Sequence, residues 1–329
     1  MTPRSFPLWL ALVCAIVCGA GVALQSRING ELGQRLGDGV TAAVISFGSG
    51  LVILIVAMAV APVGRRGFGR VVAALRSRGV PWWYVAGGAA GAFLVLSQGV
   101  AAAVLGVALF TVAVVAGQTV SGLVLDRIGL GPGGRRPITP ARLAGALIAL
   151  GAVTWAVSAQ LGGPVPIWLM LLPLISGLGL GWQQAVNGQV RVVAESALTA
   201  TFVNFVVGTS VLLVIMAVDW SLRGLPKPLP SEPWLYLGGA IGCVFIAAAA
   251  LLVRITGVLL LGLATVAGQL VTALLLDLLA PSSPEPVAFS TVAGTLLALV
   301  AVAVASIRWG RRRPTHGEEG SQHAVSRDG

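Results

Sequence analysis

Charged residues are scarce in this chain. Asp, Glu, Lys and Arg account for 10% of its 329 residues, and hydrophobic residues account for 57%. A soluble domain carries about a quarter charged residues, because its surface faces water. A charged fraction this low excludes an ordinary water-soluble protein and indicates one that is embedded in a lipid bilayer.

Residues that build catalytic and metal centres are also few. Both histidines, His316 and His323, lie in the polar segment 310–329, which is expected to be a disordered cytoplasmic tail. The three cysteines lie in apolar segments, and an odd number there argues against a disulfide framework. The sequence has no glycine-rich phosphate loop followed by lysine and no metal-ligand spacing. It therefore predicts no enzyme activity, no drive by ATP and no cofactor.

Apolar runs of membrane-crossing length make up most of the chain. A helix needs about 20 residues to cross the hydrocarbon core of a bilayer. Six charge-free runs have the length of one span, and two more, 79–125 and 143–190, have about twice that length. These runs predict an all-α integral membrane protein with ten transmembrane helices. The helices are expected at about 6–26, 39–61, 82–103, 106–127, 142–161, 166–187, 197–219, 233–253, 257–278 and 287–308.

The distribution of arginine predicts the orientation. Most arginines lie at the N-terminus, in the gaps after the second, fourth, sixth and eighth predicted helices, and after the tenth. The opposite side holds only Arg27, Arg35, Arg223 and Lys227. By the positive-inside rule, both termini are expected in the cytoplasm. Because the basic residues cluster between spans, no nucleic-acid partner is expected.

The gap after the second predicted helix is strongly basic. Residues 62–80 form a short amphipathic stretch with five arginines. Such a stretch beside a span is expected to lie on the inner leaflet against anionic lipid, so membrane lipids are expected partners. A binding surface for a regulatory partner is the alternative.

The two halves of the chain are similar in sequence. Residues 115–126 read VAGQTVSGLVLD and residues 266–277 read VAGQLVTALLLD, which are identical at eight of twelve positions. A second match joins QSRING, which begins at Gln25, with QQAVNG, which begins at Gln183. A repeat on this scale predicts two structural units of five helices each. The units are expected to cover residues 1–161 and 166–309.

Five spans are an odd number, so the second unit must enter the membrane upside down relative to the first. An inverted repeat of this kind, with a pseudo-two-fold axis in the membrane plane, is typical of secondary transporters. Because both units belong to one chain, a monomer can be complete by itself.

Polar side chains inside the predicted spans are candidates for function, since they are costly at bilayer depth. Gln118 and Ser121 lie near the middle of the fourth predicted helix, and Gln269 and Thr272 lie at the matching place in the ninth. Each half thus supplies an amide and a hydroxyl on one helix face. An amide donates and accepts hydrogen bonds, which suits binding of a small polar or zwitterionic solute. The alternative is that the two amides bond each other and only join the helices.

Two further polar pairs lie at the expected ends of the first and sixth helices. Gln25 and Asn29 form one i,i+4 pair, and Gln183 and Asn187 form the other. They either line the two opposite mouths of a pathway or serve as polar helix termini. The sequence favours neither interpretation.

Asp126 and Asp277 end the fourth and ninth predicted helices. The C-terminal end of a helix dipole repels a carboxylate, so capping alone does not explain the repeated acid. One interpretation is a structural ion pair with an arginine such as Arg127 or Arg142. The other is coupling to protons or cations, and the structural pair is favoured.

These motifs resemble the YdcZ-like family, which belongs to the drug/metabolite transporter superfamily alongside EamA-type carriers. Family members are commonly single five-helix units, so this chain resembles a fused pair. The Asn-Gly and Gly-Gln…Asp motifs of the family match Asn29-Gly30, Asn187-Gly188, Gly117-Gln118…Asp126 and Gly268-Gln269…Asp277.

The resemblance implies export or exchange of small metabolites in the bacterial inner (plasma) membrane. We therefore expect a secondary transporter that carries a small polar or amphipathic metabolite or drug by alternating access. A non-transporting membrane receptor or scaffold is the alternative.

Overall fold

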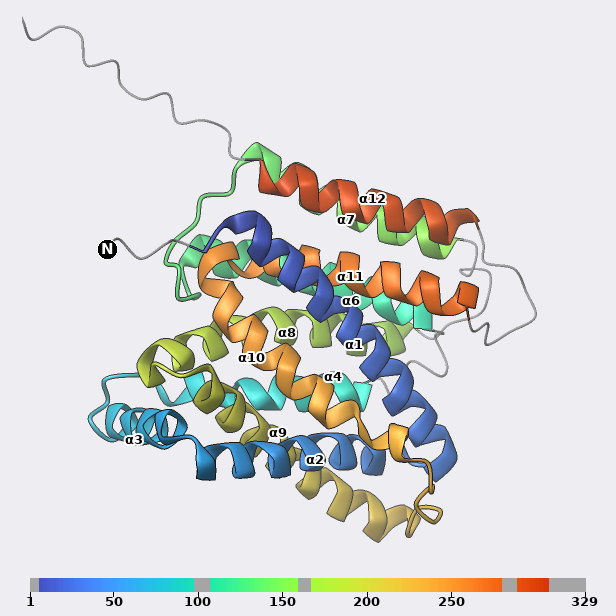
Figure 1. Cartoon of the computed structure of the whole chain (residues 1–329). Helices are drawn as coiled ribbons and strands as arrows, with labels where there is room; N and C mark the ends of the chain where they lie inside the picture. The colour runs from blue at the N-terminus through green and yellow to red at the C-terminus, as the bar shows by residue number, and fades with distance from the viewer. Residues whose placement is uncertain (1–5, 98–106, 159–166, 280–288, 308–329) are drawn as a thin grey trace, which may run out of the picture.

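The computed structural model describes residues 6–97, 107–158, 167–279 and 289–307, and within these ranges the chain is helical without strands (Figure 1). The helices are α1 (Leu8–Leu36), α2 (Gly39–Val60), α3 (Pro62–Arg76), η1 (Trp82–Ala86), α4 (Gly87–Ser97), α6 (Val107–Ile128), α7 (Pro140–Ser158), α8 (Ile167–Ala194), α9 (Ala197–Arg223), η3 (Pro233–Tyr236), α10 (Gly238–Thr256), α11 (Val258–Leu279) and α12 (Phe289–Ser306).

Several of these helices have the length and composition of membrane spans. Four helical segments of the described chain are long and apolar enough to cross a bilayer: Leu8–Leu36, Gly39–Val60, Ala197–Arg223 and Pro233–Thr256. Shorter apolar helices cover other predicted spans, such as Val258–Thr272 and Val292–Ser306. The all-helical, apolar character that the sequence predicts is therefore present, while the number of ten spans stays a prediction. The expected tail, 310–329, lies outside the described residues.

Helices α1 and α8 are longer than predicted. The expected segments 6–26 and 166–187 end where polar residues begin, whereas the helices continue to Leu36 and Ala194. Polar side chains do not stop a helix, because its backbone hydrogen bonds depend on φ and ψ and not on hydropathy. The helices end instead at residues with positive φ, Gly37 at 66° and Glu195 at 51°.

The two turns that follow these long helices have the same local structure. After the residue with positive φ, Asp38 begins α2 and Ser196 begins α9 as N-cap residues. Their side-chain oxygens accept backbone N–H groups of the following helix at 2.8 Å and 3.1 Å. Such bonds satisfy donors that the first turn of a helix leaves free.

Helices from the two halves of the sequence pack directly against each other. Helix α6 lies against α8, and α11 lies against α1; likewise α4 packs on α8 and α9, and α10 packs on α1 and α2. Helix α7 pairs with α12 at one edge of the molecule (Figure 1). Each of these contacts between the halves therefore recurs with the two halves exchanged.

Glycine permits the closest of these contacts. A methyl group added at Gly117 in α6 would collide with the backbone oxygen of Leu174 in α8, and one added at Gly268 in α11 would collide with that of Ile16 in α1. Helices in lipid associate through such close backbone approach, because burial from water does not drive them together.

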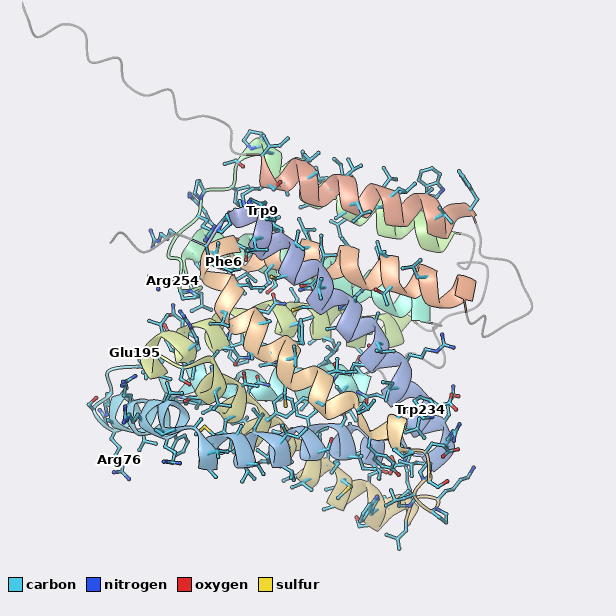
Figure 2. The ribbon with its side chains drawn as sticks, in the orientation of Figure 1. Phe6, Trp9, Arg76, Glu195, Trp234 and Arg254 are labelled. Carbon is cyan, nitrogen blue, oxygen red and sulfur yellow. The ribbon has the colours of Figure 1, made fainter. Side chains whose placement is uncertain are left out.

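Charged and aromatic residues lie at both ends of the bundle. Arg76, Glu195 and Arg254 lie toward one end, together with the aromatic residues Phe6 and Trp9, while Trp234 lies at the other (Figure 2). At the Trp234 end, Arg35 forms ion pairs with Glu31 and Glu232 and lies 5.9 Å from the centre of the Trp234 ring.

Candidate functional site

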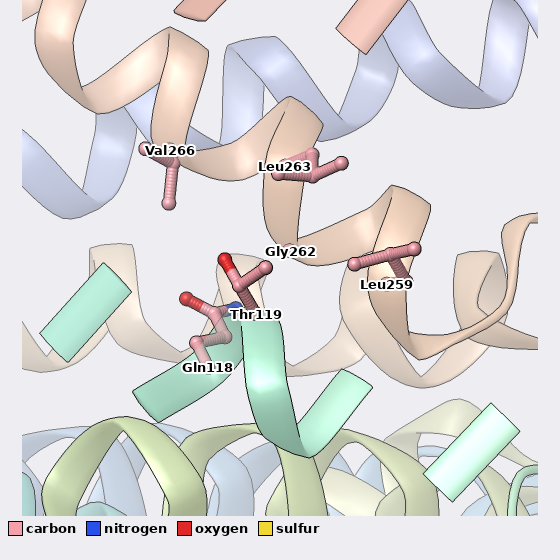
Figure 3. A pocket seen from close by; sticks show the side chains of 6 residues that line it. All are labelled: Gln118, Thr119, Leu259, Gly262, Leu263 and Val266. Carbon is pink, nitrogen blue, oxygen red and sulfur yellow. The ribbon is translucent and has the colours of Figure 1, made fainter. Parts of the chain in front are cut away.

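Gln118 lies at the contact between α6 and α11. Its side chain is 3% exposed and covers Gly262, where an added methyl group would lie 2.8 Å from the amide Nε2. Figure 3 shows the narrow space between the two helices, whose other lining residues are Thr119, Leu259, Leu263 and Val266. The missing side chain at position 262 lets the amide reach across from one half to the other.

This space is too narrow to admit a water molecule. The Nε2 atom of Gln118 has no hydrogen-bond partner among the described residues. A buried donor without a partner costs about 1–3 kcal/mol. Gln118 therefore keeps a free donor at the contact between the halves. A wide solvated cavity, which a carrier needs when it is open, is not formed at Gln118 in this conformation.

The other three residues of the predicted central set are placed differently. Ser121 donates a hydrogen bond at 2.9 Å to the backbone oxygen of Leu178 in α8, so its hydroxyl joins two helices. Gln269 and Thr272 are partly exposed on α11. Within the described chain, no hydrogen bond joins the amides of Gln118 and Gln269, so the proposed amide-to-amide link is not formed here.

A second group of amides lies where α8, α9 and α4 meet. Gln183 and Asn187 in α8 each donate a hydrogen bond at 2.9 Å to Oδ1 of Asn204 in α9. Gly87 and Gly91 of α4 pack on these amides, and an added methyl group at either would lie 2.8 Å from Asn187 Oδ1 or 2.6 Å from Gln183 Nε2. One oxygen thus holds two amides of the repeated motif in place.

The matching group lies where α1, α2 and α10 meet. Gln25 donates a hydrogen bond at 2.8 Å to the backbone oxygen of Gly238 in α10. Asn29 lies against the same glycine, and its Oδ1 has no partner among the described residues. Ser46 stands where the other half has Asn204, and its hydroxyl has no partner in the described part either.

The prediction that these two polar pairs lie at helix ends is wrong. Both pairs lie inside the long helices α1 and α8, and Asn29, Gln183 and Asn187 are at most 9% exposed. They are buried because each contacts a glycine or an amide of a neighbouring helix. Whether they also line a pathway stays a prediction.

Gln184 was not among the predicted site residues. It is 2% exposed, and neither Nε2 nor Oε1 of its amide has a partner within the described residues. It follows Gly177 and Gly181 on one stripe of α8, at i+7 and i+3, and both glycines pack on α6 near Gln118 and Ser121. Gln184 is the second glutamine of the QQAVNG motif, so the sequence shows a polar residue inside this helix. A comparison of the two halves does not find it, because Gln183 matches Gln25 whereas Gln184 matches Ser26.

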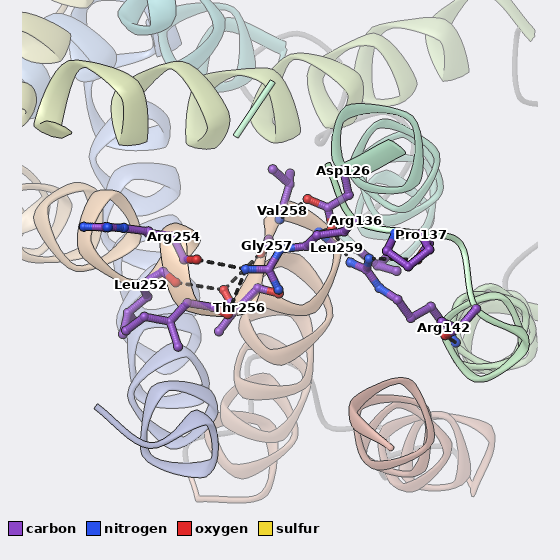
Figure 4. Close-up of polar contacts among 12 residues, drawn as sticks. Asp126, Arg136, Pro137, Arg142, Leu252, Arg254, Thr256, Gly257, Val258 and Leu259 are labelled. Carbon is purple, nitrogen blue, oxygen red and sulfur yellow. Dashed lines mark hydrogen bonds and ion pairs between the residues drawn. The ribbon is translucent and has the colours of Figure 1, made fainter. Parts of the chain in front are cut away.

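Asp126 is buried near the end of α6 and binds the start of α11. Its carboxylate accepts backbone N–H groups of Val258 at 2.9 Å and Leu259 at 3.3 Å. Arg142 of α7 donates to the same carboxylate in a buried ion pair (Figure 4). The favoured interpretation, an ion pair with an arginine such as Arg142, is therefore present. The side chain of Asp277 lies outside the described residues.

Arg136 binds the helix that precedes this contact. Its guanidinium donates to the backbone oxygens of Arg254, Ile255 and Thr256 at 2.8–3.1 Å, at the C-terminal end of α10. Helix α10 ends at Thr256 because the next residue, Gly257, has a non-helical φ of 79°. Helix α11 then begins at Val258. A cation at a helix C-terminus and an anion at a helix N-terminus both match the helix dipoles. We name Asp126, Arg136 and Arg142 together the clasp.

The described residues include no group of three or more His, Cys, Asp or Glu side chains that could hold a metal ion. The polar groups of the site are thus amides, hydroxyls and the ion pair of the clasp.

Comparisons with known proteins give a family and a fold. A family model described as "Putative inner membrane exporter, YdcZ" matches residues 10–155 and 168–304, one segment in each half. A solved structure titled "Crystal structure of protein" has a TM-score of 0.63 and 20% identity, covering 90% of this chain and 95% of that chain. At this identity the likeness shows the fold alone. A comparison with curated proteins gave no match.

Proposed function

Because this chain belongs to the YdcZ family, we propose that it is a secondary transporter that moves a small polar or amphipathic solute across the inner membrane by alternating access. Its family match and its apolar helices make it a transmembrane transport protein. The observation that carries the proposal is the match to a family of inner-membrane exporters in one segment of each half.

The proposal treats residues 1–161 and 166–309 as inverted repeats of five spans. The reciprocal packing supports it, since α6 lies on α8 as α11 lies on α1, and α4 lies on α9 as α10 lies on α2. Contacts that stay the same when the two units are exchanged are characteristic of units related by a two-fold axis. With five spans in each unit, that axis lies in the membrane plane and both termini lie in the cytoplasm.

The buried polar side chains suit binding of an uncharged or zwitterionic solute. Among the described residues, the buried charged side chains are Asp126 and Arg142, which pair with each other. The other buried polar groups are amides and hydroxyls. We assign solute contact to Gln118 and Gln184, because both amides have atoms without partners. Gln269 and Thr272 complete the set on α11.

The clasp holds the cytoplasmic end of the solute pathway closed. It joins α6 and α7 of the first half to α10 and α11 of the second, at the end where Arg254 lies. Opening toward the cytoplasm must separate Asp126 from the backbone of Val258. The free energy of these bonds therefore sets part of the balance between the open and closed states.

The test begins with a thermal-shift screen of purified protein against amino acids, amines, sugars and nucleosides, because a ligand stabilises the state that it binds. The best ligand is then used in uptake measurements with reconstituted vesicles. We expect Gln118→Ala to reduce uptake about tenfold, as the loss of one hydrogen bond of about 1.4 kcal/mol predicts. The matched control is Gln34→Ala, which removes an exposed amide from α1.

Unchanged uptake by both Gln118→Ala and Gln184→Ala would show that these amides do not contact the solute during transport. Absence of saturable uptake for every ligand that binds would favour the alternative of a receptor or scaffold.

A further inference from the structure

Helix α3 (Pro62–Arg76) begins two residues after α2 ends at Val60. Figure 1 shows it nearly end-on where α2 is seen from the side, so it lies across the end of the bundle and does not continue along it. Exposed aliphatic residues of α2, such as Val52, Val56 and Val60, recur at i,i+4 spacing on the outer surface. These residues face lipid, which places α3 at the level of the headgroups.

One face of α3 is fixed to the protein. Its buried residues Gly64, Gly67 and Val71 lie on the turn between α8 and α9. The hydroxyl of Thr199 donates to the backbone oxygen of Gly64 at 2.9 Å. An added methyl group at Gly67 would lie 2.5 Å from the same hydroxyl oxygen. The close fit means that α3 cannot turn about its axis without losing this contact.

Arg70 strengthens the attachment at the edge of that face. Its guanidinium donates at 2.8 Å to the backbone oxygen of Ala194 and lies 3.0 Å from the carboxylate of Glu195. Ala194 is the last residue of α8, and Glu195 follows it with a positive φ of 51°. Arg70 therefore has a structural partner, and so does Arg65, whose guanidinium donates to the backbone oxygen of Ala59. This separates both from Arg66, Arg76 and Arg78.

The opposite face of α3 and the turn that follows it present arginines that have no such partner. Arg66 and Arg76 on the helix and Arg78 two residues after its end are exposed, and no salt bridge reaches them from the described residues. Val63 and Phe68, at 54% and 41% exposed, flank this basic face. Basic side chains bordered by apolar ones at headgroup depth match the chemistry of an anionic lipid surface.

We propose that α3 and the turn after it form a binding site for anionic phospholipid headgroups, with Arg66, Arg76 and Arg78 as the phosphate ligands. A guanidinium binds phosphate through two parallel N–H groups, which favours arginine over lysine at such a site. Because α3 is fixed to the turn between α8 and α9, bound lipid holds that turn of the second half at the membrane surface. The site does not depend on which solute the protein carries.

The experiment uses the full chain in nanodiscs of phosphatidylcholine alone or with about 30% phosphatidylglycerol, at low salt, where surface charges are least screened. Wild-type protein should unfold at a higher temperature with the anionic lipid. The variant R66Q/R76Q/R78Q should lose most of that increase while keeping the wild-type Tm in phosphatidylcholine. The matched control, R127Q/R135Q/R254Q, removes three exposed arginines from other elements near the same end and should keep the increase.

Three results would overturn the proposal. One is an unchanged lipid effect in R66Q/R76Q/R78Q, and another is an equal loss in the control variant, which would mean general surface charge. The third is an equal rise in Tm when inorganic phosphate is added in phosphatidylcholine, which would mean a site for free anions. If the triple variant fails to fold, native mass spectrometry of R76Q and R127Q decides, since only R76Q should retain less phosphatidylglycerol than wild type.

Discussion

The carboxylate of Asp126, in the last turns of α6, accepts a hydrogen bond at 2.9 Å from the backbone N–H of Val258, the first residue of α11. The acid is unfavourable for the end of its own helix but favourable for the start of another. Arg142 balances its charge. One side chain thus links three helices, two from the first half and one from the second.

Replacing Asp126 with alanine should lower stability more than an ordinary loss of an ion pair. The change leaves Arg142 buried without its partner, which costs about 3–5 kcal/mol. Thermal or denaturant unfolding in detergent measures the effect. The control is Asp219→Ala, since Asp219 pairs with the exposed Arg223 and should contribute about 0–1 kcal/mol. Equal effects of both variants would contradict a structural role for Asp126.

Replacing Arg136 with lysine should loosen the break between α10 and α11. The guanidinium reaches three backbone oxygens, whereas the ammonium group of lysine cannot match the fixed geometry of the fork. Amide hydrogen exchange around residues 254–260 should become faster, with no change in α2. Protection equal to wild type at the break would show that Arg136 does not hold it.

Adding a methyl group at Gly177 should be far more costly than adding one at Gly48. At Gly177 it would collide with the backbone oxygen of Val114 in α6, whereas nothing lies within 4 Å of the same group at Gly48. Overpacking costs about 1–3 kcal/mol, while alanine in an open helix position stabilises by about 1 kcal/mol relative to glycine. Unfolding measurements on Gly177→Ala and Gly48→Ala should therefore differ in sign. Two neutral variants would contradict the close packing of α6 and α8.

Much of this arrangement is visible in the sequence, because it depends on local pattern. Charge-free runs predict where helices lie, and the basic stretch 62–80 coincides with the amphipathic helix α3. The repeated motifs point to Gln118 and Asp126, both of which the structure places at contacts between the halves. Hydropathy does not predict that α1 continues to Leu36, since polar residues are compatible with a helix that leaves the membrane core.

The partners of the polar residues could not be predicted, because they depend on which helices pack together. Nothing near Asp126 in sequence indicates that it binds Val258, 132 residues away. The role of Asn204 as the shared acceptor for two amides depends on the crossing of α8 and α9. Gln184 is notable only because its surroundings leave its amide without a partner.

Acid should weaken the contact between Arg35 and the loop before η3. The hydrogen bond from Arg35 lowers the pKa of Glu232 below its ordinary value. A carboxyl group with a lowered pKa in the folded state stabilises the protein above its unfolded pKa, and this contribution is lost as the pH falls through the folded pKa. Unfolding temperatures measured from neutral to acidic pH should therefore fall less steeply for Glu232→Gln than for wild type. Identical slopes would contradict the contact.

The inverted arrangement of the two halves is tested most directly by labelling one cysteine on each side of the membrane. Ser77→Cys and Ser231→Cys place exposed thiols in corresponding loops of the two halves, in a chain whose three natural cysteines have been replaced by alanine. A maleimide that cannot cross the membrane is added to intact cells. It should label Ser231→Cys at once and Ser77→Cys only after the membrane is opened. Labelling of both positions from the same side would contradict the inverted repeat, and with it the proposed transport mechanism.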